Sequence, residues 1–196
     1  MPDKGVTVAV AQSLEDEVAT LHREHAGELL RYARGAGGCE ELAREAVQET
    51  FLRYFIERTY GREIVYQRAW LFEVLRNYLR DRASAAAIHR ELPMEHAELR
   101  PDLRPSPEMV VGGIQTAEKI AESLSPREFE CLRLRTQGLS YGEIGTVMQV
   151  RTGTVGALLA RVHEKVRKVA GTEGGEDLIA SAIFELIQER TACSLG

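Results

Sequence analysis

This sequence of 196 residues is poor in cysteine and has no long apolar run. Its three cysteines (Cys39, Cys131 and Cys193) lie far apart and form no C-x-x-C pair. That spacing offers no readable disulfide framework or zinc site, and it favours the reducing cytoplasm. No run reaches the roughly 18 apolar residues that a membrane span needs. The short run at 6–11 lacks the flanks of a signal peptide, so we expect no membrane insertion.

Motifs of catalysis are missing as well. The sequence contains no glycine-rich phosphate loop, no nucleophile elbow and no paired-carboxylate motif. Among its five histidines, no pair completes a metal-binding motif such as H-E-x-x-H. His25 falls on the apolar face of an expected helix, where a core histidine is the simplest interpretation. The sequence therefore predicts a protein that is not an enzyme and that uses no cofactor and no metal ion.

Charge is abundant but segregated. The net charge is −5, yet residues 62–90 carry six arginines against three acids, and residues 151–169 carry five basic groups against one glutamate. Acidic stretches flank both islands. Two basic islands in an acidic chain indicate two separate contacts with an anion such as a nucleic-acid backbone. Two solvated helix faces would give the same pattern.

Proline divides the chain. Four of its six prolines fall between Pro93 and Pro107, in an acidic stretch with no apolar period that continues to Gly112-Gly113. Such a stretch is typical of an extended linker. No strand pattern occurs on either side of it. We therefore predict an all-α protein with two small helical domains at 12–90 and 114–170, a linker at 91–113, and an extension at 171–196 that contains an amphipathic helix.

The first domain is predicted to contain three helices. Apolar residues recur at helical spacing from Leu14 to Gly35, from about Cys39 to Tyr60, and from about Ala69 onward. The second helix is expected to bury one side, formed by Ala43, Val47, Thr50, Phe51, Tyr54 and Phe55. The third is expected to bury Leu71, Val74, Leu75, Tyr78 and Leu79. Its other side carries a stripe of Arg76, Asn77 and Arg80, which suits phosphates and base edges.

The second domain has sharper local signals. Ser125 with Glu128, and Ser140 with Glu143, have the spacing of two helix N-terminal capping boxes. The first helix is expected to end near Gly138, and a break at Gln149 precedes a last helix that buries Val155, Leu159, Val162, Val166 and Val169. A short helix, a tight turn and a longer basic helix are typical of a helix-turn-helix, although any three-helix module could show this spacing.

These residues resemble a known family. The segment 43–53 (AREAVQETFLR) together with Trp70 and 76–82 (RNYLRDR) is similar to region 2 of bacterial sigma-70 factors. The segments 124–128 (LSPRE), 138–144 (GLSYGEI) and 153–155 (GTV) are similar to region 4. Their order, the short chain and the missing region 3 resemble the extracytoplasmic function (ECF) subgroup over about residues 14–170.

The resemblance implies a transcription initiation factor that binds core RNA polymerase and directs it to promoter DNA. It implies polymerase contacts through Glu45, Gln48 and Glu49, and contacts with the −10 element through Arg76, Asn77, Arg80 and Arg82. It also implies contacts with the −35 element through a last group: Arg151, Thr152, Thr154, Arg161 and Lys165. An anti-sigma factor is a further candidate partner. Trp70, at the start of its helix, is expected to be a core residue or to support a wedge.

The sequence also departs from the family pattern. Gly156, Ala157 and Leu158 replace a usual Lys-Ser-Arg-like triplet, Arg151 replaces a Ser-like helix cap, and Gln149 stands where glycine is common. These changes predict weaker or altered −35 recognition, because each lost phosphate contact lowers affinity for all sequences. Two alternatives stay open: a conventional helix-turn-helix regulator that acts without being a polymerase subunit, and a degenerate sigma-like protein that binds polymerase but reads DNA poorly.

Overall fold

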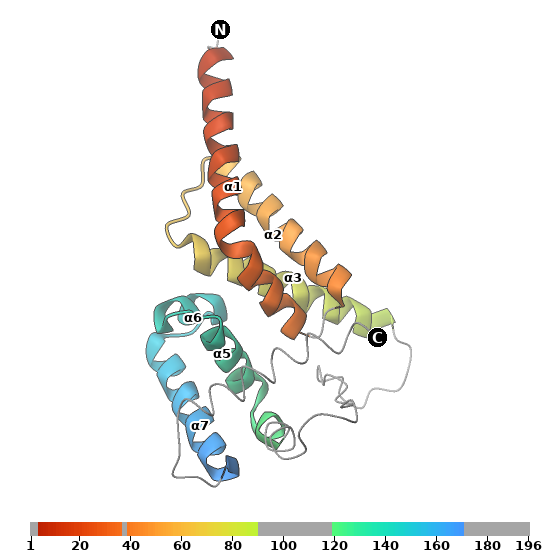
Figure 1. Cartoon of the computed structure of the whole chain (residues 1–196), viewed down its shortest axis with the longest axis vertical. Coiled ribbons are helices and arrows are strands. Elements are labelled where there is room, and N and C mark those ends of the chain that lie inside the picture. The colour runs from red at the N-terminus through yellow and green to blue at the C-terminus, as the bar shows by residue number, and fades with distance from the viewer. Residues whose placement is uncertain (1–3, 37–38, 90–118, 171–196) are drawn as a thin grey trace. The chain divides into compact units, whose positions relative to one another are not determined.

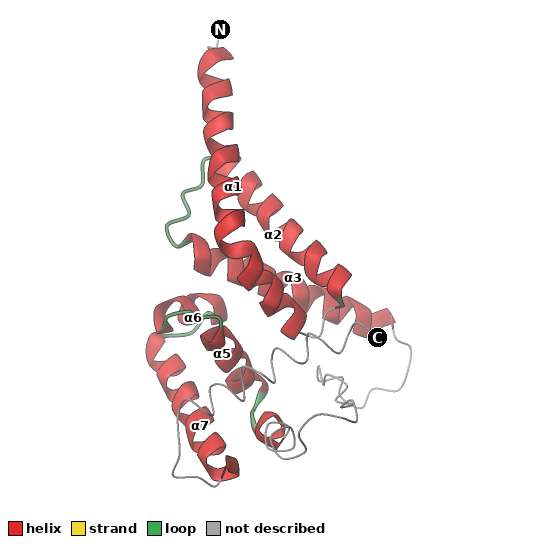
Figure 2. Ribbon diagram, in the orientation of Figure 1, coloured by secondary structure: helices red, strands yellow, loops and turns green. Residues whose placement is uncertain are grey.

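The computed structural model describes residues 4–36, 39–89 and 119–170, which fold into helices joined by turns, without a strand in these ranges (Figure 1; Figure 2). This confirms the all-α prediction. The chain divides into two compact units, Met1–Ser84 and Ala85–Gly196. All of the predicted linker (91–113) and all of the C-terminal extension (171–196) lie outside the described residues, so the boundaries of the four predicted segments stay a prediction.

The first unit contains α1 (Lys4–Gly35), α2 (Glu40–Thr59) and most of α3 (Gln67–His89), which continues past Ser84. α1 begins well before the predicted start at Leu14. Residues 6–13 contain neither glycine nor proline, so nothing in them stops the helix from extending toward the N-terminus. α2 begins after Cys39, whose side chain makes no capping hydrogen bond.

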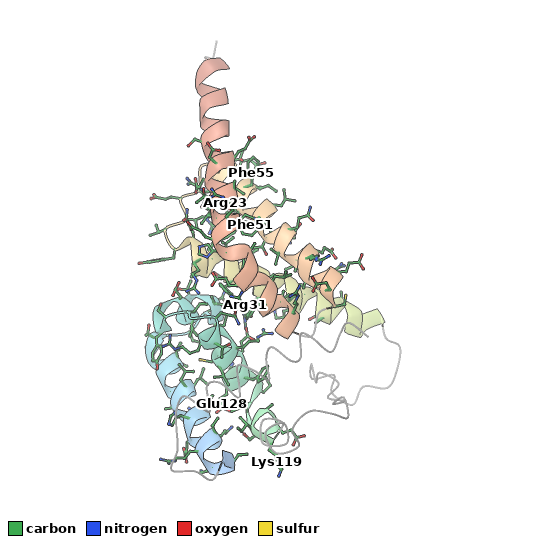
Figure 3. The ribbon with its side chains drawn as sticks, viewed as in Figure 1. Arg23, Arg31, Phe51, Phe55, Lys119 and Glu128 are labelled. Atoms are coloured by element: carbon green, nitrogen blue, oxygen red, sulfur yellow. The ribbon has the colours of Figure 1, made fainter. Side chains whose placement is uncertain are left out.

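The core of this unit follows the predicted face of α2 but only part of that of α3, where Val74, Tyr78 and Leu79 are half-buried. α2 buries Ala43, Ala46, Val47, Thr50, Phe51 and Tyr54, while Phe55 is only half-buried. The ring of Phe51 (labelled in Figure 3) lies against His22 of α1, with ring centroids 4.9 Å apart. Phe72 of α3, which the sequence pattern missed, is fully buried and meets Tyr32 edge-on at 5.4 Å.

Two polar networks fasten α1 to the other helices. Glu17 accepts hydrogen bonds from Tyr54 Oη (2.6 Å) and from the Arg58 guanidinium (3.1 Å). Burial, and then the hydrogen bond to Glu17, raise the pKa of Tyr54 to about 12. Glu28 accepts from Arg68 of α3 at 2.7 Å and lies 2.7 Å from His25 Nδ1. The prediction of a core histidine is therefore wrong: His25 is half-buried and paired with a carboxylate.

The second unit contains α5 (Pro126–Thr136), α6 (Tyr141–Met148) and α7 (Thr152–Ala170), preceded by a helical segment at 119–123. Both predicted capping boxes are present. α7 buries Val155, Val162 and Val166, whereas Leu159 and Val169 are half-buried. Ile120 and Leu124 pack with Val162 and Val166, so the segment before α5 closes the core.

Candidate nucleic-acid interface

The arginine stripe of α3 lies at the surface of the first unit. Arg80 and Arg82 are exposed, and Arg76 and Asn77 are half-buried. Arg80 Nε lies 3.8 Å from the exposed Asp81 carboxylate. A contact of this length between two exposed side chains is weak, and a phosphate can displace it.

A hollow of about 320 Å³ adjoins this stripe. Its walls come from α2, α3 and the turn between them: Arg53, Ile56, Glu57, Arg62, Trp70, Glu73, Val74 and Asn77. The half-buried Trp70 ring meets the buried Tyr54 edge-on, with centroids 5.6 Å apart. Because Tyr54 fixes that ring, Trp70 is both a packed residue and a wall of the hollow.

The segment that joins α2 to α3 exposes apolar and aromatic side chains that sequence reasoning missed. Tyr60, Val65 and Tyr66 have 86%, 72% and 73% of their surfaces exposed. Three large side chains exposed on one short segment make this segment a candidate binding surface. The sequence did contain a signal for this segment. Tyr60 and Tyr66 flank a short stretch between two expected helices, and neither tyrosine belongs to the buried face of a helix.

The predicted polymerase residues project from α2. Glu45 and Gln48 are exposed, while Glu49 is half-buried and pairs with Arg53 at 2.8 Å. Leu52 and Ile56 follow at helical spacing and expose 51% and 43% of their surfaces. This face therefore combines acidic and amide groups with an apolar stripe, as protein interfaces do.

The predicted polymerase and −10 residues also touch one another. Glu45 accepts hydrogen bonds from Tyr78 Oη at 2.7 Å and from Arg82 at 2.9 Å. These hydrogen bonds, the one from Tyr78 first, lower the pKa of Glu45. The guanidinium groups of Arg53 and Arg82 lie 5.7 and 5.8 Å from the centre of the Tyr78 ring. The two predicted surfaces are thus adjacent and share an ion pair.

In the second unit, α5, α6 and α7 form the expected helix-turn-helix arrangement. Gly138 ends the first turn at φ +78°, and Gln149 ends α6 at φ +56°. The candidates Arg151, Thr152, Thr154 and Arg161 are all exposed on or just before α7. Leu158, however, is only 6% exposed. Position 158 therefore packs inward, whereas Gly156 is half-buried and Ala157 is exposed.

Lys165 differs from the other −35 candidates. Its ammonium donates to the Glu128 carboxylate at 2.6 Å and to the Ser123 carbonyl at 2.8 Å. These bonds join α7 to the start of α5 and give Lys165 a structural role that competes with a role at DNA. Its assignment to the −35 element stays a prediction.

Within the described ranges, no group of three or more His, Cys, Asp or Glu side chains could hold a metal ion. No helix in those ranges is both long enough and apolar enough to cross a membrane.

Comparison with known proteins decides the family. Residues 115–166 match the family described as sigma-70, region 4. The ECF RNA polymerase sigma factor SigE of Mycolicibacterium smegmatis is 26% identical over 184 residues, which cover 89% of this chain and 71% of that protein. SigL of Mycobacterium tuberculosis is 29% identical over 151 residues, 75% of this chain and 83% of that protein. The chain belongs to the ECF subgroup of sigma-70 factors.

Solved structures agree with this fold. The sigma factor is similar to CnrH, solved in complex with the cytosolic domain of CnrY, at a TM-score of 0.54 and 20% identity over 85% of this chain and 96% of that one. It is also similar to RpoE of Bartonella quintana, which was solved in complex with the anti-sigma factor NepR. The TM-score is 0.53 and the sequence identity is 20%, over 79% of this chain and 99% of that one. Sigma factors are not enzymes, so the prediction of a non-enzymatic protein is confirmed.

Proposed function

We propose that this sigma factor binds core RNA polymerase through the outer face of α2 and directs it to promoters, where α3 meets the −10 element and α7 the −35 element. The observation that carries this proposal is the match of both helical units to sigma factors within one alignment. A conventional helix-turn-helix regulator would require only the second unit to match. Because RNA polymerase works in the cytoplasm, the proposal also implies a cytoplasmic protein.

Opening of the −10 element is the step that the first unit supports. Separating two strands costs stacking free energy, which a protein offsets by holding an unstacked base and its strand. The hollow offers the Trp70 ring and the Asn77 amide to such a base. Tyr60 and Tyr66 add exposed rings, and stacking on such a ring contributes about 1–3 kcal/mol per base. The arginines of the α3 stripe then hold the backbone of the displaced strand.

Recognition of the −35 element falls to α7. The second helix of a helix-turn-helix enters the major groove with its first residues toward base edges. The exposed Thr152 and Thr154 stand at that end of α7, and Arg161 lies further along it. Hydroxyl groups can contact base edges, whereas a guanidinium such as that of Arg161 suits a phosphate.

Attachment to polymerase falls to α2. The exposed Leu52 and Ile56 supply apolar area for the centre of an interface, and Glu45, Gln48 and Glu49 supply a polar rim. An anti-sigma factor that covers the same face would block polymerase. Leu52→Glu should therefore weaken binding of polymerase and of such an inhibitor alike.

Run-off transcription with core RNA polymerase tests the proposal directly. We expect transcripts that start at discrete sites only when the sigma factor is added, from templates that share −10 and −35 elements. Arg161→Ala should lower the affinity of the holoenzyme for these templates several-fold and reduce the slope of log affinity against log salt by about one. Duplex binding without any transcription would instead support the conventional regulator, and polymerase binding without initiation the degenerate sigma-like protein.

A further inference from the structure

The start of α7 carries little positive charge where a groove-reading helix needs it. Gly156 has no side chain, Ala157 is small, and Leu158 is buried in the core. After Arg151, the next basic residue along the chain is Arg161. If α7 binds a promoter, the first turns of this helix need a cation that another element supplies.

The bare backbone at Gly156 is covered by a ring from α6. A Cβ atom placed on Gly156 would lie 3.9 Å from Tyr141 Cε2, which is ordinary van der Waals contact. Tyr141 is the first residue of α6 and remains 43% exposed. A long side chain at 156 would occupy the space in which this ring lies, so the glycine and the tyrosine fit as a pair.

A cation from α5 lies on that ring. The Arg135 guanidinium carbon is 5.7 Å from the centre of the Tyr141 ring, a cation–π distance, and Arg135 Nη1 donates to the Leu139 carbonyl at 2.9 Å. In the part of the chain that the structure describes, Arg135 forms no ion pair with a carboxylate. A guanidinium has five N–H donors, so a single carbonyl leaves donors for an anion.

We propose that Arg135, held on Tyr141 above Gly156, contacts a backbone phosphate beside the −35 element and supplies the charge that the start of α7 lacks. This inference rests on the proposed function of α7. The planar guanidinium can bind a phosphate with two parallel hydrogen bonds. Tyr141 is the positioning residue, since its ring fixes the guanidinium without meeting the phosphate. A backbone contact of this kind adds affinity for every sequence and selects none.

Promoter binding by the assembled holoenzyme tests the inference. Arg135→Gln keeps a donor that can reach the Leu139 carbonyl but removes the charge. We expect this variant to bind promoter DNA about three- to ten-fold more weakly near 0.15 M salt, and its salt slope to fall by about one. The loss should be equal for strong and weak −35 sequences. The matched control is Arg127→Gln, an exposed arginine at the opposite end of α5, which should change neither quantity.

Two further variants separate charge from folding. Tyr141→Phe keeps the ring and should bind like the parent, whereas Tyr141→Ala should lose affinity as Arg135→Gln does. Ala157→Lys restores a cation on α7, and in the Arg135→Gln background it should recover most of the lost affinity. Thermal melting of each variant identifies any that fail to fold.

Equal affinity and equal salt slope for Arg135→Gln and Arg127→Gln would overturn the inference. Arg161→Ala keeps this outcome distinct from a failure of the proposed function. If Arg161→Ala weakens binding and Arg135→Gln does not, only the present inference fails. If the parent holoenzyme does not bind the promoter at all, the proposed function fails with it.

Discussion

Gln149 occupies a backbone conformation that its side chain disfavours. It ends α6 at φ +56°, in the left-handed region that glycine adopts without strain. The departure noted in the sequence therefore has a physical cost. For a residue with a Cβ that cost is about 1–2 kcal/mol, of which the greater flexibility of glycine in the unfolded chain offsets about half.

We predict that Gln149→Gly stabilises the second unit by about 0.5–1 kcal/mol. Urea unfolding followed by circular dichroism measures this change. Gln149→Ala is the matched control, because alanine removes the same side chain but keeps the strain. If the alanine variant is as stable as the glycine variant, the gain does not come from the backbone.

Glu128 of α5 (Figure 3) forms an ion pair with Lys165 of α7, and only 4% of the Glu128 side chain is exposed. Burial alone would raise the pKa of Glu128, but hydrogen bonds from Lys165 and Ser125 outweigh it and lower the pKa to about 2. The ordinary value of 4.5 applies to the unfolded chain. The stabilising contribution of this carboxylate is therefore complete above pH 4.5 and is lost as the pH falls toward 2.

We predict that Glu128→Gln flattens the loss of stability between pH 4.5 and pH 2 and costs on the order of 2 kcal/mol at pH 7. Lys165→Met should also destabilise the unit at pH 7, because it leaves a buried carboxylate unpaired. Urea unfolding at several pH values measures both effects. The exposed Arg161 supplies the control, since Arg161→Ala should leave stability unchanged. A Lys165→Met variant as stable as the parent would remove the structural role of this lysine.

At the scale of elements, α2 and α3 share a contact that couples the two predicted surfaces. Glu45 of α2 pairs with Arg82 of α3, so the carboxylate that is predicted to meet polymerase neutralises an arginine that is predicted to meet DNA. Both side chains are about half exposed, which makes the pair easy to exchange for a partner. Polymerase binding at Glu45 would release Arg82 toward the promoter.

We predict that Glu45→Gln weakens binding of core polymerase and, in the sigma factor alone, strengthens binding of forked −10 DNA about two- to five-fold. Fluorescence anisotropy with labelled DNA, with and without core polymerase, separates the two effects. The gain in DNA affinity should vanish in the Glu45→Gln/Arg82→Gln double variant. A gain that persists there would come from net charge alone.

Local signals in the sequence predicted most helix starts and the buried face of α2 correctly. Both capping boxes require only four adjacent residues each, so Ser125–Glu128 and Ser140–Glu143 could be identified without tertiary information. The inward face of α2 followed in the same way from helical periodicity. The start of α1 was missed because neither a cap nor a helix breaker marks it.

Contacts between elements could not be predicted. The pair Glu45–Arg82 joins residues 37 positions apart, and Lys165 meets Glu128 over the same separation. The sequence shows each as a charge on a helix face, and only packing decides whether that charge meets solvent, DNA or a neighbour. The roles of Lys165 and Arg82 therefore could not be decided from the sequence. The hollow beside Trp70 and the contact of Tyr141 with Gly156 could not be predicted either, because both arise from packing between helices.

At the scale of the whole molecule, the two units each have a core and each carry one basic island. Because the two units belong to one chain, binding of the second unit to DNA becomes intramolecular once the first unit has bound. Two weak DNA contacts can therefore give a high overall affinity. The C-terminal extension adds five acids and one arginine after residue 170. Its apolar residues Leu178, Ile179, Ile183, Leu186 and Ile187 recur at helical spacing and need a surface to cover them.

We expect the extension to pack on its own chain. A short amphipathic helix is stabilised mainly by burying its apolar face, and the rest of the same chain is always near enough to cover that face. Deletion of residues 174–196 should then lower the free energy of unfolding by about 1–3 kcal/mol and leave DNA and polymerase binding unchanged. Urea unfolding and anisotropy on the full and shortened chains measure both quantities. Ile183→Asp disrupts the apolar face but keeps the length and raises the negative charge. If the extension instead covers the DNA-reading surface, both changes should increase DNA affinity, and the deletion, which also removes acidic groups, should increase it more.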